Sequence, residues 1–273
     1  MFYSNAHTHS DWCDGENTLA EMAQAAEKLG FTDLGFTSHS PAPFDLTCLG
    51  VKDESAYQKA VRSLAEKSLL QISCGLEWDY YSKTPISGYD YFVGSVHYLP
   101  PRAGVYRSVD DTPENFAKTL QEWYDGDFLA LAQDYYDLVV AHITQNQPKI
   151  VGHFDLVTKF NDTLQYLTAK NQDAYEQLAL TALKKVVAVI QKYDGLVEVN
   201  TGGMSRGWKK QAYPAKFLLN YLASEEVPII ITSDTHQVDT LAYAFEETKK
   251  ILQSVGFSSS WQLKERKFVP VAF

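Results

Sequence analysis

The chain has 273 residues and a net charge of −10, with 45% hydrophobic and 21% charged residues. This composition is typical of a globular protein, and the acidic charge disfavours a nucleic-acid partner, whose binding surface is usually basic. No apolar run reaches the ~20 residues of a membrane span, and the N-terminus does not resemble a signal peptide. With only three cysteines, Cys13, Cys48 and Cys74, we expect reduced thiols in a cytoplasmic protein without a membrane partner. The sequence leaves the oligomeric state open.

Short apolar runs predict seven β-strands, which alternate with helical patterns. The predicted strands are Phe2–Ala6, Asp33–Thr37, Leu70–Leu76, Tyr91–Val96, Lys149–Gly152, Gly195–Val199 and Pro228–Thr232. The predicted helices are Thr18–Leu29, Glu54–Lys67, two within residues 112–147 that break near Asp125, then Asp173–Tyr193, Pro214–Ser224 and Leu241–Val255. This order predicts a parallel α/β barrel formed by a single domain over residues 1–273, with a doubly wound open sheet as the alternative.

Residues that can bind a metal or a phosphate stand at the ends of these predicted strands. His7 and His9 follow the first strand as a His-x-His pair, and Asp234 and His236 follow the last as an Asp-x-His pair. Taken alone, the His-x-His pair fits two surface histidines on a loop better than a metal site, whereas the Asp-x-His pair, directly after a buried run of isoleucines, is the strongest single indication. Because the carboxyl ends of parallel strands converge on one face of a barrel, their recurrence predicts a shared site. His142 falls inside a predicted helix, and we assign it a structural role.

The complete set of candidate ligands is too large for one tetrahedral ion, which takes four. It suits two or three ions, and imidazole with carboxylate favours zinc, iron or manganese over magnesium or calcium. The candidate ligands are His7, His9, Asp14, His39, Glu77, His97, His153, Asp234 and His236. Asp14 also stands in an Asp-Gly turn, which by itself indicates only a turn.

Several short motifs together resemble the polymerase-and-histidinol-phosphatase (PHP) family, and within it the monofunctional phosphatases. They are His-Thr-His-Ser-Asp from residue 7, Thr-Ser-His-Ser-Pro from 37, Gly-Leu-Glu-Trp-Asp from 75, Gly-Ser-Val-His from 94, Gly-His-Phe-Asp from 152, Glu-Val-Asn-Thr from 198 and Ser-Asp-Thr-His from 233. The resemblance covers about residues 5 to 240. It implies a distorted seven-stranded (β/α)7 TIM-like barrel with three divalent or transition metal ions, zinc, manganese or iron.

The resemblance also distributes the ligands among three ions. It places His7, His9, Glu77 and Asp234 on the first ion, Asp14, His39 and His236 on the second, and Glu77, His97 and His153 on the third. Glu77 would then bridge the first and third ions. Many members of the family have His at the position of Asp14, and this departure makes the second site harder and favours manganese or iron there.

The activity that the resemblance implies is hydrolysis of L-histidinol phosphate, a small-molecule phosphate ester, by attack of a metal-bridging hydroxide on phosphorus. The alternative within the family is another small ester, such as a sugar phosphate or a nucleotide. A non-catalytic metal-binding module or a polymerase-associated domain is a rival from a different class, and the complete ligand set speaks against it. Amidohydrolase chemistry would call for Lys at the third strand end, where Glu77 stands.

The remaining candidates concern the substrate rather than the ions. Arg206, or otherwise Lys159, is expected to bind the phosphate, because a guanidinium pairs with two oxygens. His39 or Asp14 is the candidate proton donor to the leaving group. The expected contacts of the substrate's amine and imidazole are Asp110, Asp111, Glu114, Trp78, Tyr80, Tyr98 and Asn200.

Overall fold

The computed structural model describes residues 2–42, 44 and 50–273. Cys13 and Cys74 are free thiols. The third cysteine, Cys48, lies outside the described residues. Among the helices that the structure describes, none is both long and apolar enough to cross a bilayer.

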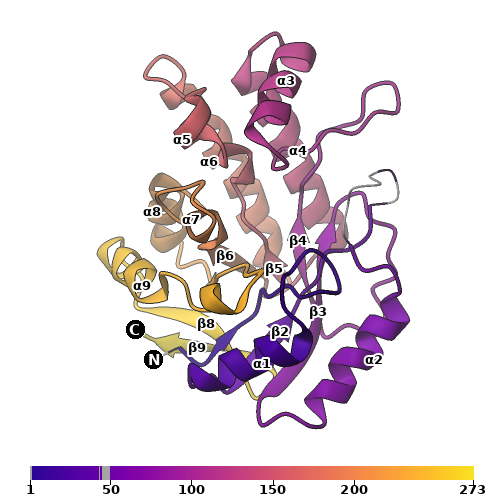
Figure 1. The fold of residues 1–273 in the computed structure, drawn as a ribbon. Coiled ribbons are helices and arrows are strands. Elements are labelled where there is room, and N and C mark those ends of the chain that lie inside the picture. The colour runs from indigo at the N-terminus through magenta and orange to yellow at the C-terminus, as the bar shows by residue number, and fades with distance from the viewer. Residues whose placement is uncertain (1, 43, 45–49) are drawn as a thin grey trace.

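One curled sheet of nine strands forms the centre of the molecule, and neighbours in the sheet are neighbours in the chain (Figure 1). The strands are β1 Ser4–Asn5, β2 Asp33–Phe36, β3 Gln71–Asp79, β4 Tyr91–Ser95, β5 Ile150–Val151, β6 Leu196–Asn200, β7 Ile229–Thr232, β8 Ser259–Lys264 and β9 Lys267–Ala272. All pairs from β1 to β8 are parallel, and β8 pairs with β9 in the antiparallel sense. The predicted parallel α/β architecture is therefore confirmed.

The curl of the sheet brings the extension of β1 against the extension of β7. Thr8 and Thr235 form a parallel bridge, and the His9 amide donates to the Thr235 carbonyl at 2.8 Å. At the opposite end of the strands β8 contacts β1, where the Leu263 amide donates to Ser4 Oγ at 2.9 Å. The first and seventh strand ends thus meet, which places the residues after them side by side.

The strand count differs from the predicted seven, because the chain adds β8 and β9 at its end. Their connection places Glu265 and Arg266 at φ of 52° and 60°. Two consecutive left-handed residues give the tight turn that suits the twist of a hairpin, but this turn usually carries Asn or Gly. The Glu-Arg pair gave no such signal, and Pro270 within β9 weakened the strand pattern further.

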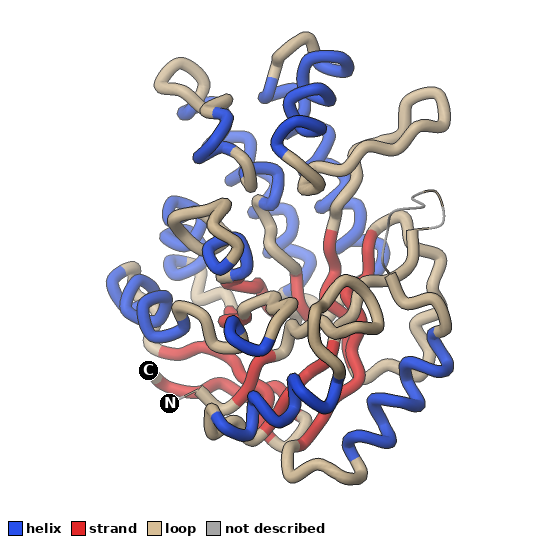
Figure 2. The backbone as a smooth tube through the Cα atoms, in the orientation of Figure 1, coloured by secondary structure: helices blue, strands red, loops and turns tan. Residues whose placement is uncertain are grey.

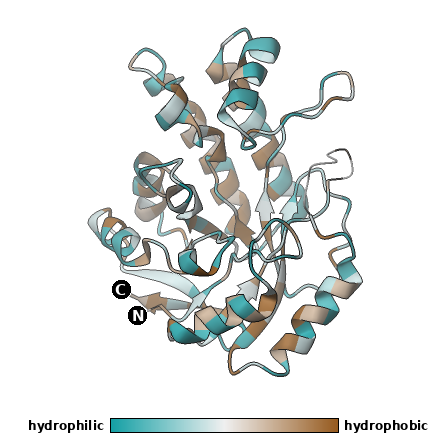
Figure 3. Ribbon diagram, viewed as in Figure 1, coloured by the Kyte–Doolittle hydropathy of each residue, from teal (hydrophilic) through white to brown (hydrophobic). Residues whose placement is uncertain are grey.

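Helices surround the sheet, as the tube in Figure 2 shows. Their bounds are α1 Leu19–Lys28, α2 Glu54–Ala65, α3 Pro113–Tyr124, α4 Phe128–Asn146, α5 Asn161–Leu164, α6 Gln172–Ile190, α7 Gly202–Ser205, α8 Lys216–Ser224 and α9 Phe245–Ser254, with single 3₁₀ turns at Leu156–Thr158 and Val238–Thr240. The short helices α5 and α7 were not predicted, since four residues carry no periodic pattern. α4 and α6 pack on each other and carry broad apolar surface (Figure 3).

Local capping explains where the predicted helices begin and break. Thr18 and Glu21 form a reciprocal capping box at the start of α1. α3 ends at Asp125, which adopts a left-handed conformation, and the Asp127 side chain then accepts hydrogen bonds from the first amides of α4. The two helices predicted within residues 112–147 are therefore confirmed, together with their break.

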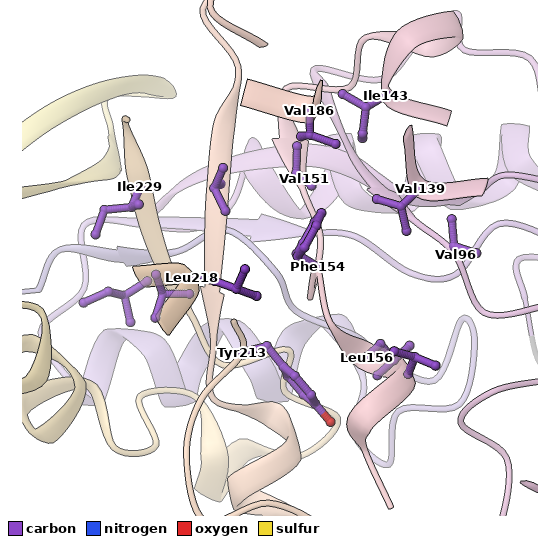
Figure 4. Packing of buried hydrophobic residues seen from close by; sticks show 14 of the residues in the cluster. Val96, Val139, Ile143, Val151, Phe154, Leu156, Val186, Tyr213, Leu218 and Ile229 are labelled. Atoms are coloured by element: carbon purple, nitrogen blue, oxygen red, sulfur yellow. The ribbon is translucent and has the colours of Figure 1, made fainter. Parts of the chain in front are cut away.

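Apolar packing fills both faces of the sheet and supports the strand ends. The larger cluster lies between the sheet and the helices (Figure 4). A smaller cluster includes Tyr91, whose hydroxyl donates to the Ala6 carbonyl at 2.7 Å, directly before His7. Gly35 and Gly75 leave room for this ring, because a Cβ at either position would lie within 3.0 Å of it. The tyrosine thus packs beneath the first candidate ligand.

Candidate metal centre and pocket

Four buried side chains from three parts of the chain converge at the carboxyl end of the sheet. His9 Nε2 lies 3.1 Å from Asp234 Oδ1 and 3.4 Å from Glu77 Oε2. His7 Nε2 lies 3.4 Å from the same Glu77 oxygen and 3.6 Å from Asp234 Oδ1. The ligand atoms of these four residues all lie within 4.8 Å of one another, a spacing that could hold a metal ion. The set equals the one expected for the first ion.

A second group lies beside the first and centres on Asp14. Its Oδ1 lies 3.1 Å from His236 Nε2, 3.5 Å from His39 Nε2 and 3.9 Å from His9 Nδ1. Asp14, His39 and His236 are the residues expected for a second ion, and His9 joins them here. The turn that carries Asp14 is fixed because the Glu16 amide donates to the His236 carbonyl at 2.7 Å.

A third group surrounds Glu77, whose two oxygens face different sets of histidines. Glu77 Oε1 lies 2.9 Å from His153 Nε2 and 3.3 Å from His97 Nε2. Glu77 Oε2 lies 2.8 Å from His39 Nδ1. The atoms that lie close enough for one ion come from His39, Glu77 and His97, whereas the expected third set had His153 in place of His39. Glu77 is shared by two groups in either arrangement.

Atoms without hydrogen-bond partners concentrate at this convergence. Such buried orphans are uncommon in native proteins, where nearly all buried polar groups are paired. They include His7 Nε2, His9 Nε2, Glu77 Oε2 and His236 Nε2. Each is an atom that an ion would bind, so the donor set fits a cluster of metal ions.

Charge interactions keep the carboxylates of the cluster ionised. Burial alone would raise the pKa of Glu77, but the surrounding histidines lower it well below its usual value. Burial would likewise raise the pKa of Asp14, and neighbouring histidines, His39 first, lower it. A carboxyl group that ionises so readily suits a ligand better than a proton donor. This finding weakens the expectation that Asp14 protonates the leaving group.

The histidines divide according to their charged neighbours. Burial lowers the pKa of His7 and His97, but nearby carboxylates outweigh it and raise both values well above 6.5. For His9, burial and two neighbouring histidines dominate and lower the pKa to about 3. His7 and His97 therefore carry a proton at neutral pH when the carboxylates face them without a metal ion.

Glu198 holds several of these ligands in place, and the sequence analysis included it in a family motif without giving it a role. The side chain is fully buried. Its carboxylate lies 2.6 Å from His7 Nδ1 and accepts hydrogen bonds from the His153 amide at 2.7 Å, Thr232 Oγ1 at 2.7 Å and Asn200 Nδ2 at 3.0 Å. A carboxylate behind a ligating imidazole fixes the ring and its tautomer. A glutamate inside the apolar run of β6 was the available signal.

A second buried carboxylate, Asp79, has the same relation to His97. Asp79 Oδ2 accepts the His97 amide at 2.9 Å and lies 3.3 Å from His97 Nδ1. Its other oxygen accepts from the Tyr81 amide at 2.8 Å. Asp79 directly follows Trp78 at the end of β3, so one strand supplies both the shared ligand Glu77 and the support of His97.

A pocket of about 670 Å³ opens above the ligand groups. Arg206 and Lys159, the predicted phosphate residues, both line it. Arg206 Nη2 donates to Asp234 Oδ2 at 2.9 Å, and Lys159 Nζ donates to the Asp110 carbonyl at 2.6 Å. Both cations are thus held at the pocket by an acidic residue.

The pocket wall beyond the histidines carries aromatic rings and charges of both signs, with Arg107 and Lys118 as well as two aspartates. Asp110, Asp111 and Tyr98 line it, as does Tyr106. Burial would raise the pKa of Asp110, but Lys159 and His97 lower it to about 2, so this carboxylate is ionised at neutral pH. Tyr106 stacks on Phe44 with ring centroids 3.6 Å apart. An anionic group beside flat rings is suited to a cationic, planar ligand.

Four of the predicted substrate residues, Trp78, Tyr80, Glu114 and Asn200, do not line this pocket. Side chains alternate along a strand, so Trp78 points away from the face of Glu77 and packs against Phe92 and His142. Tyr80 packs against His142 as well. Glu114 is exposed in the first turn of α3. Asn200 is buried, where its amide donates to Glu198 and to Asp234.

The remaining histidine, His142, lies in α4 outside the cluster. Its Nε2 lies 2.9 Å from the Trp78 carbonyl, and its Nδ1 lies 2.7 Å from Asn146 Nδ2. Burial lowers its pKa, so the ring is neutral. With both nitrogens paired, His142 has the contacts expected of a structural residue.

Comparisons with known proteins relate this chain to one family. Residues 5–202 match the family model of the PHP domain. The histidinol-phosphatase of Bacillus subtilis is 27% identical over 269 residues, which cover 89% of this chain and 96% of that protein.

Two solved structures share the fold. A Listeria monocytogenes protein assigned as a histidinol phosphatase superposes with a TM-score of 0.75 at 22% identity, covering 89% of this chain and 99% of that one. A Lactococcus lactis histidinol phosphate phosphatase, solved with zinc, L-histidinol and phosphate, superposes with a TM-score of 0.68 at 16% identity. The match covers 98% of both chains. At these identities the likeness establishes the fold.

Proposed function

The chain belongs to the PHP domain family, and we propose that it hydrolyses L-histidinol phosphate to L-histidinol and phosphate with the aid of bound metal ions. The B. subtilis relative that matches nearly its whole length carries this activity in its name. The Lactococcus structure was solved with zinc and with both products of that reaction. We extend this activity to the present chain because its own side chains form a suitable group of metal ligands.

One observation carries the proposal above the others. Eight ligand-type residues form the three groups, and His153 lies 2.9 Å from Glu77 beside them. Several of their buried atoms have no partner except one that a cation would supply. We propose three ions, with Glu77 shared between two of them. Divalent ions held there would make bound water nucleophilic at neutral pH and neutralise the charge on the phosphoryl oxygens.

The side chains around the ligand groups then bind and orient the ester. Arg206 presents its guanidinium beside Asp234, at the edge of the first group, and is proposed to bind phosphoryl oxygens. Lys159 also lines the pocket, 3.5 Å from Asp110 Oδ2, and is the second proposed phosphate contact. Both cations would offset negative charge, on the carboxylates beside them and on the bound phosphate.

The leaving group is proposed to lie against Asp110, Asp111 and the aromatic rings of the wall. The two carboxylates would attract an ammonium group, and Tyr98 would contact the imidazole. A leaving group that carries an ammonium would gain this contact, and a neutral sugar would not. His39, the other expected proton donor to the leaving oxygen, lines the pocket but belongs to the proposed ligand set, and a metal-bound imidazole is neutral, so we assign it as a ligand rather than as the donor.

A panel of phosphate esters tests the proposal. We expect protein loaded with zinc or manganese to show its highest kcat/KM on L-histidinol phosphate, ahead of glucose 6-phosphate and AMP. Chelator-treated protein should lose activity and regain it with metal. If the metal-loaded protein prefers the sugar phosphate or the nucleotide, the proposed substrate is contradicted, but the assignment as a phosphoesterase stands.

A further inference from the structure

Tyr213 carries a buried hydroxyl group whose hydrogen-bonding capacity is unused. The residue is 2% exposed, and its hydroxyl oxygen has no hydrogen-bond partner among the described residues. Tyr213 nevertheless lines the pocket above the ligand groups. A buried hydroxyl without a partner costs free energy, so its retention calls for a role.

The other pocket residues with unpartnered buried atoms indicate that this role is ligand binding. Among the described residues that line the pocket, those with an unpartnered buried atom are Glu77, His153, His236 and Tyr213. The first three belong to the proposed ligand set. The phenol of Tyr213 is a hydrogen-bond donor, and a donor facing a pocket awaits an acceptor on the ligand.

The backbone and the neighbouring glycines fix where this hydroxyl lies. Tyr213 and Asn200 exchange two backbone hydrogen bonds of 2.8 and 2.9 Å, which join Tyr213 to the end of β6. A Cβ added to Gly203 would lie 2.9 Å from the Tyr213 hydroxyl, and one added to Gly202 would lie 2.8 Å from Arg206 Nη2. The hydroxyl and the guanidinium therefore lie around the same turn and border the same part of the pocket.

The orientation of the ring agrees with this placement. Tyr213 lies at the edge of the apolar cluster, and its hydroxyl points away from Phe154 and Leu218 (Figure 4). Its ring meets the His153 ring edge to face, with centroids 6.5 Å apart. The apolar part of the tyrosine is thus anchored while its polar tip is directed out of the core.

We propose that the Tyr213 hydroxyl donates a hydrogen bond to a phosphoryl oxygen of the bound ester, next to the contact made by Arg206. The inference rests on the proposed function in one respect, that the ligand is a phosphate ester, and it is independent of the leaving group. Burial raises the pKa of Tyr213 well above its usual value, so the hydroxyl keeps its proton and can donate it to a ligand.

A competing structural role would involve Asp155. This buried carboxylate accepts the Ala215 amide at 3.0 Å through Oδ2, while its Oδ1 has no partner. Asp155 does not line the pocket. If the Tyr213 hydroxyl served Asp155 rather than the ligand, its removal would lower stability and leave phosphate binding unchanged.

The test compares two Tyr→Phe variants of the metal-loaded protein. Tyr213→Phe removes the pocket hydroxyl, and Tyr193→Phe removes a second unpartnered buried hydroxyl that lies in the turn after α6, outside the pocket. Affinity for inorganic phosphate is measured by calorimetry, with metal content, thermal stability and kcat/KM beside it. Since a hydrogen bond to a charged group is involved, Tyr213→Phe should weaken phosphate binding by about 10- to 100-fold.

The accompanying readouts separate the outcomes. Tyr193→Phe should bind phosphate as the parent does, and both variants should keep the parent's metal content. Equal phosphate affinity in Tyr213→Phe and the parent would overturn the inference, as would an Asp155→Asn variant that reproduces the entire loss.

Failure of the proposed substrate gives a different result. If the parent binds phosphate through Tyr213 but does not turn over L-histidinol phosphate, the substrate assignment fails and the hydroxyl contact stands. If the parent hydrolyses L-histidinol phosphate and Tyr213→Phe does so with unchanged kcat/KM and phosphate affinity, the function stands and the contact is refuted.

Discussion

Buried polar side chains at the two ends of the parallel sheet can differ in how completely the protein pairs their atoms, as Asp33 and the candidate ligands show. At the amino end of β2, Asp33 is 1% exposed, and its carboxylate accepts hydrogen bonds from Thr32 Oγ1 and the Arg266 amide, both at 2.8 Å. At the carboxyl end, His7, His9 and Glu77 are as deeply buried, yet each keeps an atom without a partner. The protein supplies both partners of Asp33, whereas His7, His9 and Glu77 each keep an atom that a ligand could bind. The comparison separates residues that stabilise the fold from residues that perform the chemistry.

The largest expected effect comes from neutralising a shared or primary carboxylate of the ligand end. Glu77→Gln and Asp234→Asn should each lower phosphatase activity by at least ~10³-fold, because they remove anionic ligands from the metal ions. Asp33→Asn, the matched change at the other end, should lower the melting temperature with much less effect on kcat. His142→Gln should leave catalysis nearly unchanged. Activity loss in His142→Gln as severe as in Glu77→Gln would break the distinction between the two classes of buried residue.

A smaller effect is expected for the cation next to the ligands. Arg206→Ala should lower kcat/KM by ~10- to 200-fold, since a charged hydrogen bond to phosphate is lost. Arg206→Lys should restore only part of this, because an ammonium cannot form the bidentate contact. Metal content should stay at the parent's level, and inorganic phosphate should inhibit the variant less. Unchanged kcat/KM and phosphate inhibition would leave Lys159 as the leading phosphate contact.

Glu198 sharpens the comparison, because it is buried and fully paired like Asp33 but lies behind the ligands. Glu198→Gln should weaken metal affinity by about 10- to 100-fold, since the carboxylate that orients His7 loses its charge. Competition with a chromogenic chelator measures this affinity, and Asp33→Asn is the control. If both variants lose stability alone and keep the parent's metal affinity, Glu198 belongs with the structural carboxylates.

The raised pKa values of two ligand histidines also predict that metal binding releases protons. The pKa values of His7 and His97 are raised, so these rings are protonated at neutral pH in the metal-free protein. Metal binding requires neutral imidazole, so it should release protons and strengthen as the pH rises. Calorimetric titration of metal-free protein with zinc, repeated in buffers of different ionisation enthalpy, counts them. Binding without proton release at pH 7 would show that these histidines are already neutral.

The sequence predicted the ligand end better than its surroundings. Alternating apolar runs located β1 to β7 within a few residues, and the recurrence of His and Asp after them indicated a shared site. Glu198 was recognised only as part of a motif, because its role depends on His7 and Thr232 from other strands. Such contacts between distant segments are visible only in the folded chain.

The substrate side was harder to predict because side-chain direction matters there. Trp78 neighbours Glu77 in sequence, but the alternation of a strand sends it to the opposite face, and applying this rule would have removed it. Glu114 was favoured for its charge alone, although the start of α3 leaves it exposed. Asn200 lies at the correct strand end but pairs with Glu198 and Asp234. Residue type therefore indicated the chemistry, while the fold decided which residues reach the pocket.

The measurement that tests the central claim most directly is metal analysis of active protein prepared without chelator, together with its turnover of L-histidinol phosphate. The three neighbouring ligand groups predict close to three transition-metal ions per chain, and a rate that rises with metal occupancy. Active protein that contains one ion or none would contradict the account, because the unpaired atoms at the carboxyl end of the sheet would then have another purpose.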